Sequence, residues 1–119
     1  MTFNWATLSA PKDIVFKKSV RETLEQLREA GLCAITGGGA EIFDQSIRDQ
    51  ICRGKESAEE WWEVHRTWHE MGMRSTATML YGHIETIAQR VDHLRRLRTW
   101  QDETRGFRSE ERRVGKECA

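Results

Sequence analysis

Residues 76–86 read TATMLYGHIET, a short apolar, β-prone run that stops at Gly82 and is followed at once by His83 and Glu85. Thr86 then begins a pattern that is typical of a helix. In parallel α/β proteins, ligands and catalytic groups collect at the carboxyl ends of strands. A glycine there lets the backbone approach a ligand, and a carboxylate three residues on can bind it. This stretch therefore predicts part of an enzyme core and makes a simple binding module the weaker interpretation.

Helix starts are marked by capping boxes, in which a Ser or Thr and a Glu or Gln three residues later satisfy backbone N–H groups reciprocally. The boxes begin at Ser19, Ser57 and Thr86, and apolar residues at helical spacing follow each one. The first two runs end at Gly31 and Gly72, which are natural helix stops. The stripe of the third helix consists of Ile87, Val91, Leu94 and Leu97. The expected helices cover residues 19–31, 57–72 and 86–103, with shorter ones at 11–18 and 44–52.

Two strand candidates lie between these helices, at residues 32–36 and 75–80. Each follows a helix that ends in glycine and precedes a loop and another helix, and this repeat requires a parallel sheet. A barrel or doubly wound sheet of this type needs roughly 200 residues or more, whereas the chain has 119. The expected fold class is therefore α/β, as a partial (β/α) TIM-type barrel with two parallel strands and flanking helices.

The amino-acid composition of the chain limits which partners and which cellular location we expect. The 19 basic and 19 acidic side chains balance, so nothing indicates nucleic acid or an anionic membrane surface. No apolar run approaches the roughly 18 residues that span a bilayer, and the N-terminus lacks the features of a signal peptide. Three widely spaced cysteines favour reduced thiols over a disulfide framework. We therefore expect a cytoplasmic protein.

The end of the chain breaks the pattern. Residues 108–118 read RSEERRVGKEC, which continues no apolar stripe and resembles the in-frame translation of a sequencing-library adapter. A solvated charged tail is the alternative. We expect residues 1–107 to be a domain fragment and residues 108–119 to be a non-native, disordered tail.

A second strand-end motif follows the first strand candidate, where Gly37, Gly38 and Gly39 precede Glu41. Consecutive glycines expose backbone N–H groups and permit positive φ, so a carboxylate, ribose or phosphate could lie against them. The spacing is neither GxGxxG nor a P-loop, and a plain flexible turn remains open. Glu41 is expected at the same sheet edge as Glu85, which favours a binding role.

The remaining histidines have simpler interpretations. His65 and His69 have the spacing of metal ligands, but HRTWH lacks the Glu of HExxH and a third ligand, so we predict a packed or surface pair and no metal site. His93 lies among arginines and is expected on a solvated face. His83 would point into the barrel mouth, where ligand contact and structural hydrogen bonding both remain open. Core packing is the expected role of Trp61, Trp62, Trp68 and Met71.

Three segments resemble one family: GLCAITGGGAEIF, SAEEWWEVHRTWHEMGMRSTATMLYGHIET and RVDHLRRLRTWQDET. They are similar to the radical S-adenosylmethionine enzymes of the futalosine route to menaquinone, nearest to the aminofutalosine synthase group, from about Ser9 to Phe107. Thr78 to Glu85 is also similar to the superfamily motif GxIxGxxE, with Thr for the first Gly and Leu for Ile. MLYGHIE with GGGAEIF favours this group over two alternatives, the dehypoxanthine futalosine cyclase and the deazaflavin-precursor synthase.

The resemblance implies a (β/α) barrel with a [4Fe–4S] cluster on a CxxxCxxC loop and reductive cleavage of S-adenosylmethionine. The deoxyadenosyl radical would add to an enol-ether benzoate, with loss of carbon dioxide. By the same resemblance His83 is a candidate substrate contact, and no catalytic residue is assigned. The superfamily motif implies Gly82 and Glu85 as cofactor-binding residues, and we expect Gly38, Gly39 and Glu41 to bind the cofactor from the neighbouring strand end.

The chain departs from the family because it has no CxxxCxxC and cannot ligate the cluster in the family manner. We predict a parent radical S-adenosylmethionine transferase with a small-molecule substrate, and an inactive chain that binds neither cofactor alone. Nucleic-acid and membrane partners are not expected. Open sheet edges would favour self-association. The rival hypothesis is a small non-enzymatic binding or scaffold protein.

Overall fold

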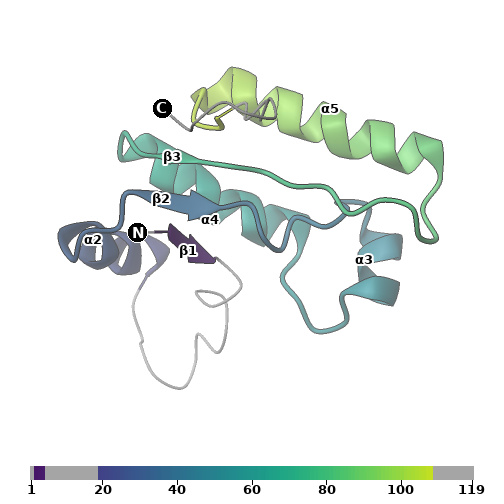
Figure 1. Ribbon diagram of the computed structural model, residues 1–119, viewed down its shortest axis with the longest axis horizontal. Helices are drawn as coiled ribbons and strands as arrows, with labels where there is room; N and C mark the ends of the chain where they lie inside the picture. Colours follow the sequence, from purple (N-terminus) through teal and green to yellow (C-terminus); the bar gives the residue numbers. More distant parts are fainter. Residues whose placement is uncertain (1, 5–18, 109–119) are drawn as a thin grey trace, which may run out of the picture.

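The computed structural model describes residues 2–4 and 19–108. Helices pack beside a small parallel sheet whose strand order is β1-β2-β3 (Figure 1). Along the chain the elements are β1 (Thr2–Asn4), α2 (Val20–Glu29), β2 (Ala34–Thr36), α3 (Gln45–Ile51), α4 (Ala58–Glu70), β3 (Arg74–Ser75) and α5 (Ile87–Thr104).

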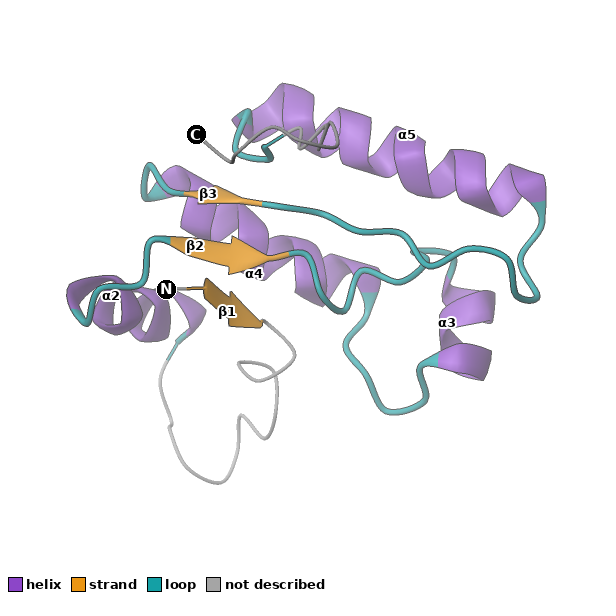
Figure 2. Ribbon diagram, viewed as in Figure 1, coloured by secondary structure: helices purple, strands orange, loops and turns teal. Residues whose placement is uncertain are grey.

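The two predicted strands are confirmed as parallel neighbours, and β1 adds a third strand that the sequence did not reveal. The predicted extent of the second was wrong, because β3 ends at Ser75 and the chain from Thr76 onward runs beside a loop (Figure 2). On the other side of β3, Ser75 forms a parallel bridge with Phe107. The chain therefore returns to the sheet after α5, as a parallel α/β repeat requires.

All three predicted capping boxes are present, at Ser19, Ser57 and Thr86. In each box the side chain at the N-cap accepts the N–H three residues on, and that residue's side chain accepts the N-cap N–H. The short helix expected from residue 44 is α3, which Asp44 caps. The helix expected at residues 11–18 lies outside the described residues, as does the expected tail apart from Arg108. None of the described helices is long and apolar enough to cross a membrane.

The predicted core role of the tryptophans is confirmed. Trp61 and Trp68 are fully buried, and Trp62 stacks on Trp100 with ring centroids 4.8 Å apart. Helix α4 carries the first three of these rings and contacts α2, β3 and α5. Phe43 packs against Trp61 at 5.1 Å. The chain segment after β2 is therefore anchored to the same aromatic core as the helices.

His65 and His69 form the predicted packed pair, and they tie α4 to the sheet. His65 Nδ1 lies 2.8 Å and His69 Nε2 lies 2.6 Å from Ser75 Oγ. His69 Nδ1 also lies 2.8 Å from Thr104 Oγ1 at the end of α5. A side chain on Gly106 would collide with the His69 ring. This buried network holds β3 and the returning segment against α4.

Candidate functional site

The segments after β2 and β3 lie side by side, at the carboxyl ends of neighbouring parallel strands (Figure 2). We call residues 37–43 the Gly loop and residues 76–86 the His loop. The Gly37 N–H donates to Thr76 Oγ1 at 3.0 Å, and Thr78 Oγ1 donates to the Gly37 carbonyl at 2.9 Å. Farther along, the Leu80 N–H donates to the Glu41 carbonyl at 2.7 Å. The two motifs singled out in the sequence are therefore bonded side by side.

Gly37 is required by the closeness of the two loops. A Cβ at this position would lie 2.5 Å from Ala77 Cα and 2.7 Å from the Thr76 carbonyl oxygen. Since these are backbone atoms, no side-chain movement can relieve the contact. The first glycine of the triplet therefore serves the approach of two protein segments.

Gly38, Gly39 and Glu41 make up the rest of the predicted binding set in the Gly loop. Gly39 and Glu41 both have positive φ, 92° and 44°. The Gly38 carbonyl accepts a hydrogen bond from Trp61 Nε1 at 3.3 Å, which ties the loop to the core. The Glu41 side chain is a quarter exposed, with Lys55 Nζ 3.7 Å from its carboxylate. Its charge is thus available at the surface of the loop.

Glu85 is held within its own loop. Its buried carboxylate accepts the N–H of Gly82 at 2.6 Å and of His83 at 2.9 Å, and Arg90 Nε lies 2.7 Å away. Burial alone would raise the pKa of Glu85, but these hydrogen bonds outweigh it and lower the pKa to about 2. Glu85 is therefore an anion that shapes the turn. Its predicted contact with a cofactor stays a prediction.

His83 also bonds inside the His loop. Its Nε2 lies 2.9 Å from the Leu80 carbonyl oxygen, and its Nδ1 lies 3.1 Å from a Glu85 carboxylate oxygen. Gly82, between these residues, has φ of 87° and open space around it. The structural role left open by the sequence is thus present, and substrate contact by His83 stays a prediction.

His93 was predicted on a solvated face, and this was wrong: it is completely buried beneath both loops. Its Nδ1 accepts the Phe43 N–H at 3.1 Å, and its Nε2 donates to the Thr78 carbonyl at 2.9 Å. The ring stacks on Phe43 at 4.0 Å. Burial, the largest effect, lowers the pKa of His93 to about 4, so the ring is neutral at pH 7. One neutral imidazole thereby links the Gly loop, the His loop and α5.

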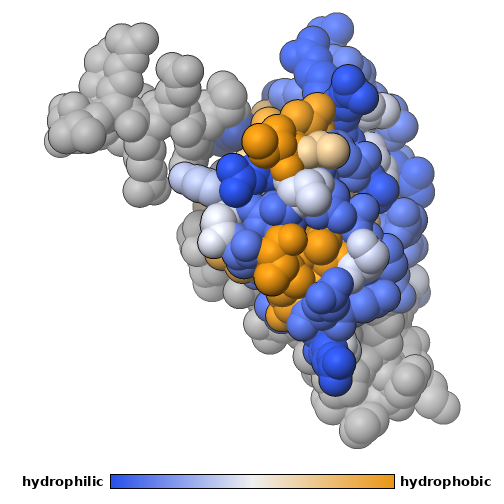
Figure 3. All heavy atoms as spheres, turned by 90° about the vertical axis from the view of Figure 1, so that its right-hand side faces the viewer, coloured by the Kyte–Doolittle hydropathy of each residue, from blue (hydrophilic) through white to orange (hydrophobic). Residues whose placement is uncertain are grey.

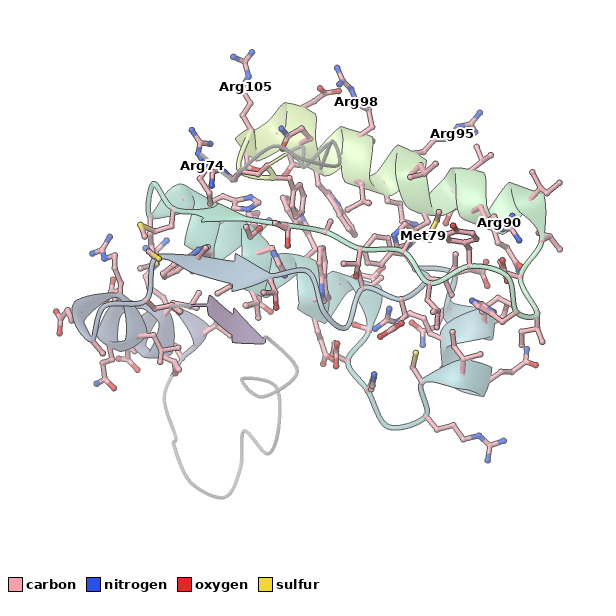
Figure 4. All side chains as sticks on the ribbon, in the orientation of Figure 1. Arg74, Met79, Arg90, Arg95, Arg98 and Arg105 are labelled. Atoms are coloured by element: carbon pink, nitrogen blue, oxygen red, sulfur yellow. The ribbon has the colours of Figure 1, made fainter. Side chains whose placement is uncertain are left out.

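The prediction for His93 failed because the face of α5 that packs against the core is not the most apolar face of this helix. His93, Leu97 and Trp100 face the core, at spacings of four and three residues that suit a helix. The predicted stripe lies mostly outside: Ile87, Val91 and Leu94 are exposed. The neighbouring arginines do reach solvent, and Figure 4 shows Arg95, Arg98 and Arg105 pointing away from the sheet. A histidine in register with Leu97 and Trp100 was the available signal.

Two buried charged residues beneath the Gly loop, Arg48 and Glu56, gave no signal in the sequence. Neither belongs to a motif, and Arg48 lies on a short helix.

A hollow of about 540 Å³ lies apart from both loops, between α4 and α5. It is lined by Glu59, Trp62, Glu63, Arg66, Arg96 and Trp100. Neither loop lines this hollow, and buried residues support both loops.

Comparison with known proteins identifies the family. Residues 8–97 match the model of the Radical SAM superfamily. The chain is 61% identical over 89 residues to the aminodeoxyfutalosine synthase of Thermus thermophilus, covering 75% of this chain and 24% of that protein. It is 51% identical over 89 residues to the synthase of Streptomyces coelicolor, covering 75% of this chain and 23% of that protein.

Relatives with other names are similar too. A 5-amino-6-(D-ribitylamino)uracil–L-tyrosine 4-hydroxyphenyl transferase of Methanosphaerula palustris is 48% identical over 89 residues, covering 75% of this chain and 24% of that protein. An FO synthase of Nocardia farcinica is 46% identical over 90 residues, 76% of this chain and 10% of that protein. The chain thus spans about a quarter or less of these relatives. The resemblance read from the sequence is confirmed, and the chain belongs to the radical SAM superfamily.

Proposed function

We propose that the chain is part of a longer radical S-adenosylmethionine enzyme with the activity of an aminodeoxyfutalosine synthase. The observation that carries the proposal is the 61% identity to such a synthase over 89 residues, which include both strand-end loops. The enzyme would join the 5′-deoxyadenosyl group of S-adenosylmethionine to an enol-ether benzoate, with loss of carbon dioxide. In this proposal residues 1–107 are a piece of a (β/α) barrel of a cytoplasmic enzyme. Residues 108–119 are foreign to it.

The residues of the Gly loop fit S-adenosylmethionine, which presents a carboxylate, an ammonium group and a ribose. Within the described part of the chain, the N–H groups of Gly38, Gly39 and Glu41 have no acceptor. Such N–H groups can bind a carboxylate or ribose oxygen, and the partly exposed Glu41 carboxylate can bind an ammonium group. When bound and reduced, S-adenosylmethionine supplies the deoxyadenosyl group. This chain's part would be to bind and orient it.

Gly82 and the N-terminal part of α5 would form the neighbouring wall of that site. Glu85 holds the Gly82 turn in shape, and the open space around Gly82 leaves room for a ring to lie against the backbone. His83, on the same loop, is the candidate for substrate contact. These assignments follow the motif and are proposals.

The iron–sulfur cluster of the superfamily does not fit this chain. Cys33, Cys52 and Cys118 do not form CxxxCxxC. Among residues 2–4 and 19–108 no three His, Cys, Asp or Glu side chains are grouped as metal ligands. We propose that residues outside this chain hold the cluster. The chain alone would therefore be inactive.

An activity assay on the longer enzyme to which this chain would belong, called the uninterrupted protein below, tests the proposal. After anaerobic loading with iron and sulfide and addition of dithionite, this protein should convert S-adenosylmethionine and the enol-ether benzoate into an adduct that contains the deoxyadenosyl group, detected by mass spectrometry. Absence of CxxxCxxC from the uninterrupted sequence would refute the proposal. An assay with tyrosine and the ribitylaminouracil serves as the comparison, since two relatives named for that pair are 48% and 47% identical. Turnover of that pair alone would replace the proposed activity with theirs.

A further inference from the structure

Arg48 is buried directly beneath the Gly loop, with 1% of its surface exposed. Its Nη1 donates to the Ala40 carbonyl at 2.7 Å and to the Ile42 carbonyl at 3.1 Å. Its Nη2 donates to the Gly39 carbonyl at 3.1 Å and to the Glu56 carbonyl at 2.7 Å, and Nε donates to the latter at 3.2 Å. One guanidinium therefore holds three carbonyls of a single loop. Lysine, a point charge with a flexible stem, cannot reproduce this planar fork.

Glu56 completes the arrangement. Its side chain is buried, and its Oε1 lies 3.9 Å from Arg48 Nη2, so the two buried charges offset each other. Glu56 Oε1 has no hydrogen-bond partner among the described residues. A Cβ on Gly39 would collide with that oxygen. Position 39 must therefore be glycine for Glu56 to remain where it is.

The bonds from Arg48 determine which way the loop presents its N–H groups. In a trans peptide the C=O and the N–H point in opposite directions. The Ala40 carbonyl is drawn to Arg48, so the N–H of Glu41 points away from it. The Ile42 carbonyl is likewise drawn to Arg48, and the Phe43 N–H then reaches His93 on the other side. Arg48 thus sets the backbone on both sides of Glu41, whose φ is 44°.

We propose that Arg48 is a positioning residue of the cofactor site: it fixes the backbone of residues 39–42 and so presents the Glu41 N–H and carboxylate to the ligand, without touching the ligand itself. This inference rests on the proposed function, because the ligand is S-adenosylmethionine. The inference goes beyond that function because it assigns a role to a buried arginine that belongs to neither strand-end motif.

The test measures S-adenosylmethionine binding by calorimetry in the uninterrupted protein and its Arg48→Lys variant. We expect Arg48→Lys to raise the Kd about tenfold or more, the equivalent of one lost hydrogen bond to a charged group. Arg53→Lys, a change at an exposed arginine close by, is the matched control and should leave the Kd unchanged. An unchanged Kd in Arg48→Lys overturns the inference.

Hydrogen exchange in the ligand-free proteins separates positioning from general stability. We expect faster exchange at residues 38–43 in Arg48→Lys, with exchange in α4 and α5 unchanged. Equal acceleration in the helices, or none in the loop, overturns the inference. If Arg48→Lys does not fold, Glu56→Gln is the second variant: it removes the counter-charge of buried Arg48 and so weakens the hold of the guanidinium on the loop carbonyls. Glu56→Gln should likewise show faster exchange at residues 38–43 with exchange in α4 and α5 unchanged. Unchanged exchange at residues 38–43 overturns the inference.

Failure of the unsubstituted protein to bind S-adenosylmethionine would refute the proposed function instead. The exchange measurement would then still decide whether Arg48 shapes the loop.

Discussion

Buried histidines connect separate elements of this chain through their ring nitrogens. His93 links the two loops to α5, while His65 and His69 hold Ser75 of β3. Burial, the largest effect in each, lowers the pKa of His69 and of His93 to about 4 and that of His65 well below its usual value. Arg74 beside His69 and His69 beside His65 act in the same direction. All three rings are therefore neutral at pH 7 and would have to take up protons inside the core at low pH.

The first prediction concerns pH. Between about pH 6.5 and pH 4 the unfolded chain binds protons on these histidines and the folded chain does not, so the free energy of unfolding falls as pH falls through this window. A shift of this size corresponds to about 3 kcal/mol for each of His69 and His93. Below pH 4.5 Glu85 adds a further loss, because its pKa is lowered to about 2. Urea unfolding midpoints from pH 7 to pH 4 measure the effect, and a constant midpoint would contradict it.

The second prediction concerns His93 itself. His93→Phe keeps a ring on Phe43 but leaves the Phe43 N–H and the Thr78 carbonyl without their partner. Two buried unpaired groups should cost about 2–4 kcal/mol of stability. The variant should also lose one histidine's share of the pH dependence. Arg95→Ala, at an exposed position on the same helix, is the control, with an expected change within about 0.5 kcal/mol. Equal losses in both variants would show that the two hydrogen bonds do not matter.

At the scale of elements, what could be predicted is what is local in the chain. The boxes at Ser19, Ser57 and Thr86 mark the three longest helices of residues 19–108, because a cap needs only residues three apart. The end of β3 could not be predicted, since Thr76 and Thr78 bond to Gly37, about forty residues away. Three-residue β1 carries too little pattern to identify. The same holds for the candidate site. Its two motifs are contiguous in the sequence and could be predicted, whereas Arg48 and His93 support the loops through contacts that the sequence does not show.

The third prediction tests the contact between the loops. Gly37→Ala places a Cβ against the backbone of Thr76 and Ala77, so the two loops must separate. We expect a loss of about 1–3 kcal/mol from overpacking and, in the uninterrupted protein, weaker S-adenosylmethionine binding. Gly31→Ala is the control, since its φ of 105° is strained for alanine but open space surrounds it. It should lower stability without affecting binding. Unchanged binding in Gly37→Ala would separate the loop contact from the site.

At the scale of the whole molecule, apolar side chains remain uncovered. Figure 3 shows hydrophobic side chains on the end of the molecule where α3 and the start of α5 lie. Exposed fractions run from 41% for Val91 to 76% for Ile87. Within residues 19–108 the exposed large apolar side chains are Leu80, Tyr81, Ile84, Ile87, Val91 and Leu94. Such a surface is typical of a face that meets another protein segment.

The fourth prediction follows from this surface. Isolated, the chain should self-associate through the exposed face of α5, with an average mass in light scattering that rises with concentration. Replacing Val91 and Leu94 by lysine should reduce this association and retain the helical circular dichroism, because both side chains are exposed. Arg95→Lys with Arg98→Lys, on the outward side of the same helix, is the control. A discrete dimer with a sharp cooperative melt, insensitive to the lysine pair, would favour a small self-contained binding or scaffold protein.

We propose that the Gly loop and the His loop together form one wall of an S-adenosylmethionine site. A crystal structure of the uninterrupted protein with S-adenosylmethionine tests it most directly. We expect ligand atoms within hydrogen-bonding distance of the backbone of residues 38–41 and in contact with Gly82. A ligand bound elsewhere, with both loops packed only against protein, would contradict it.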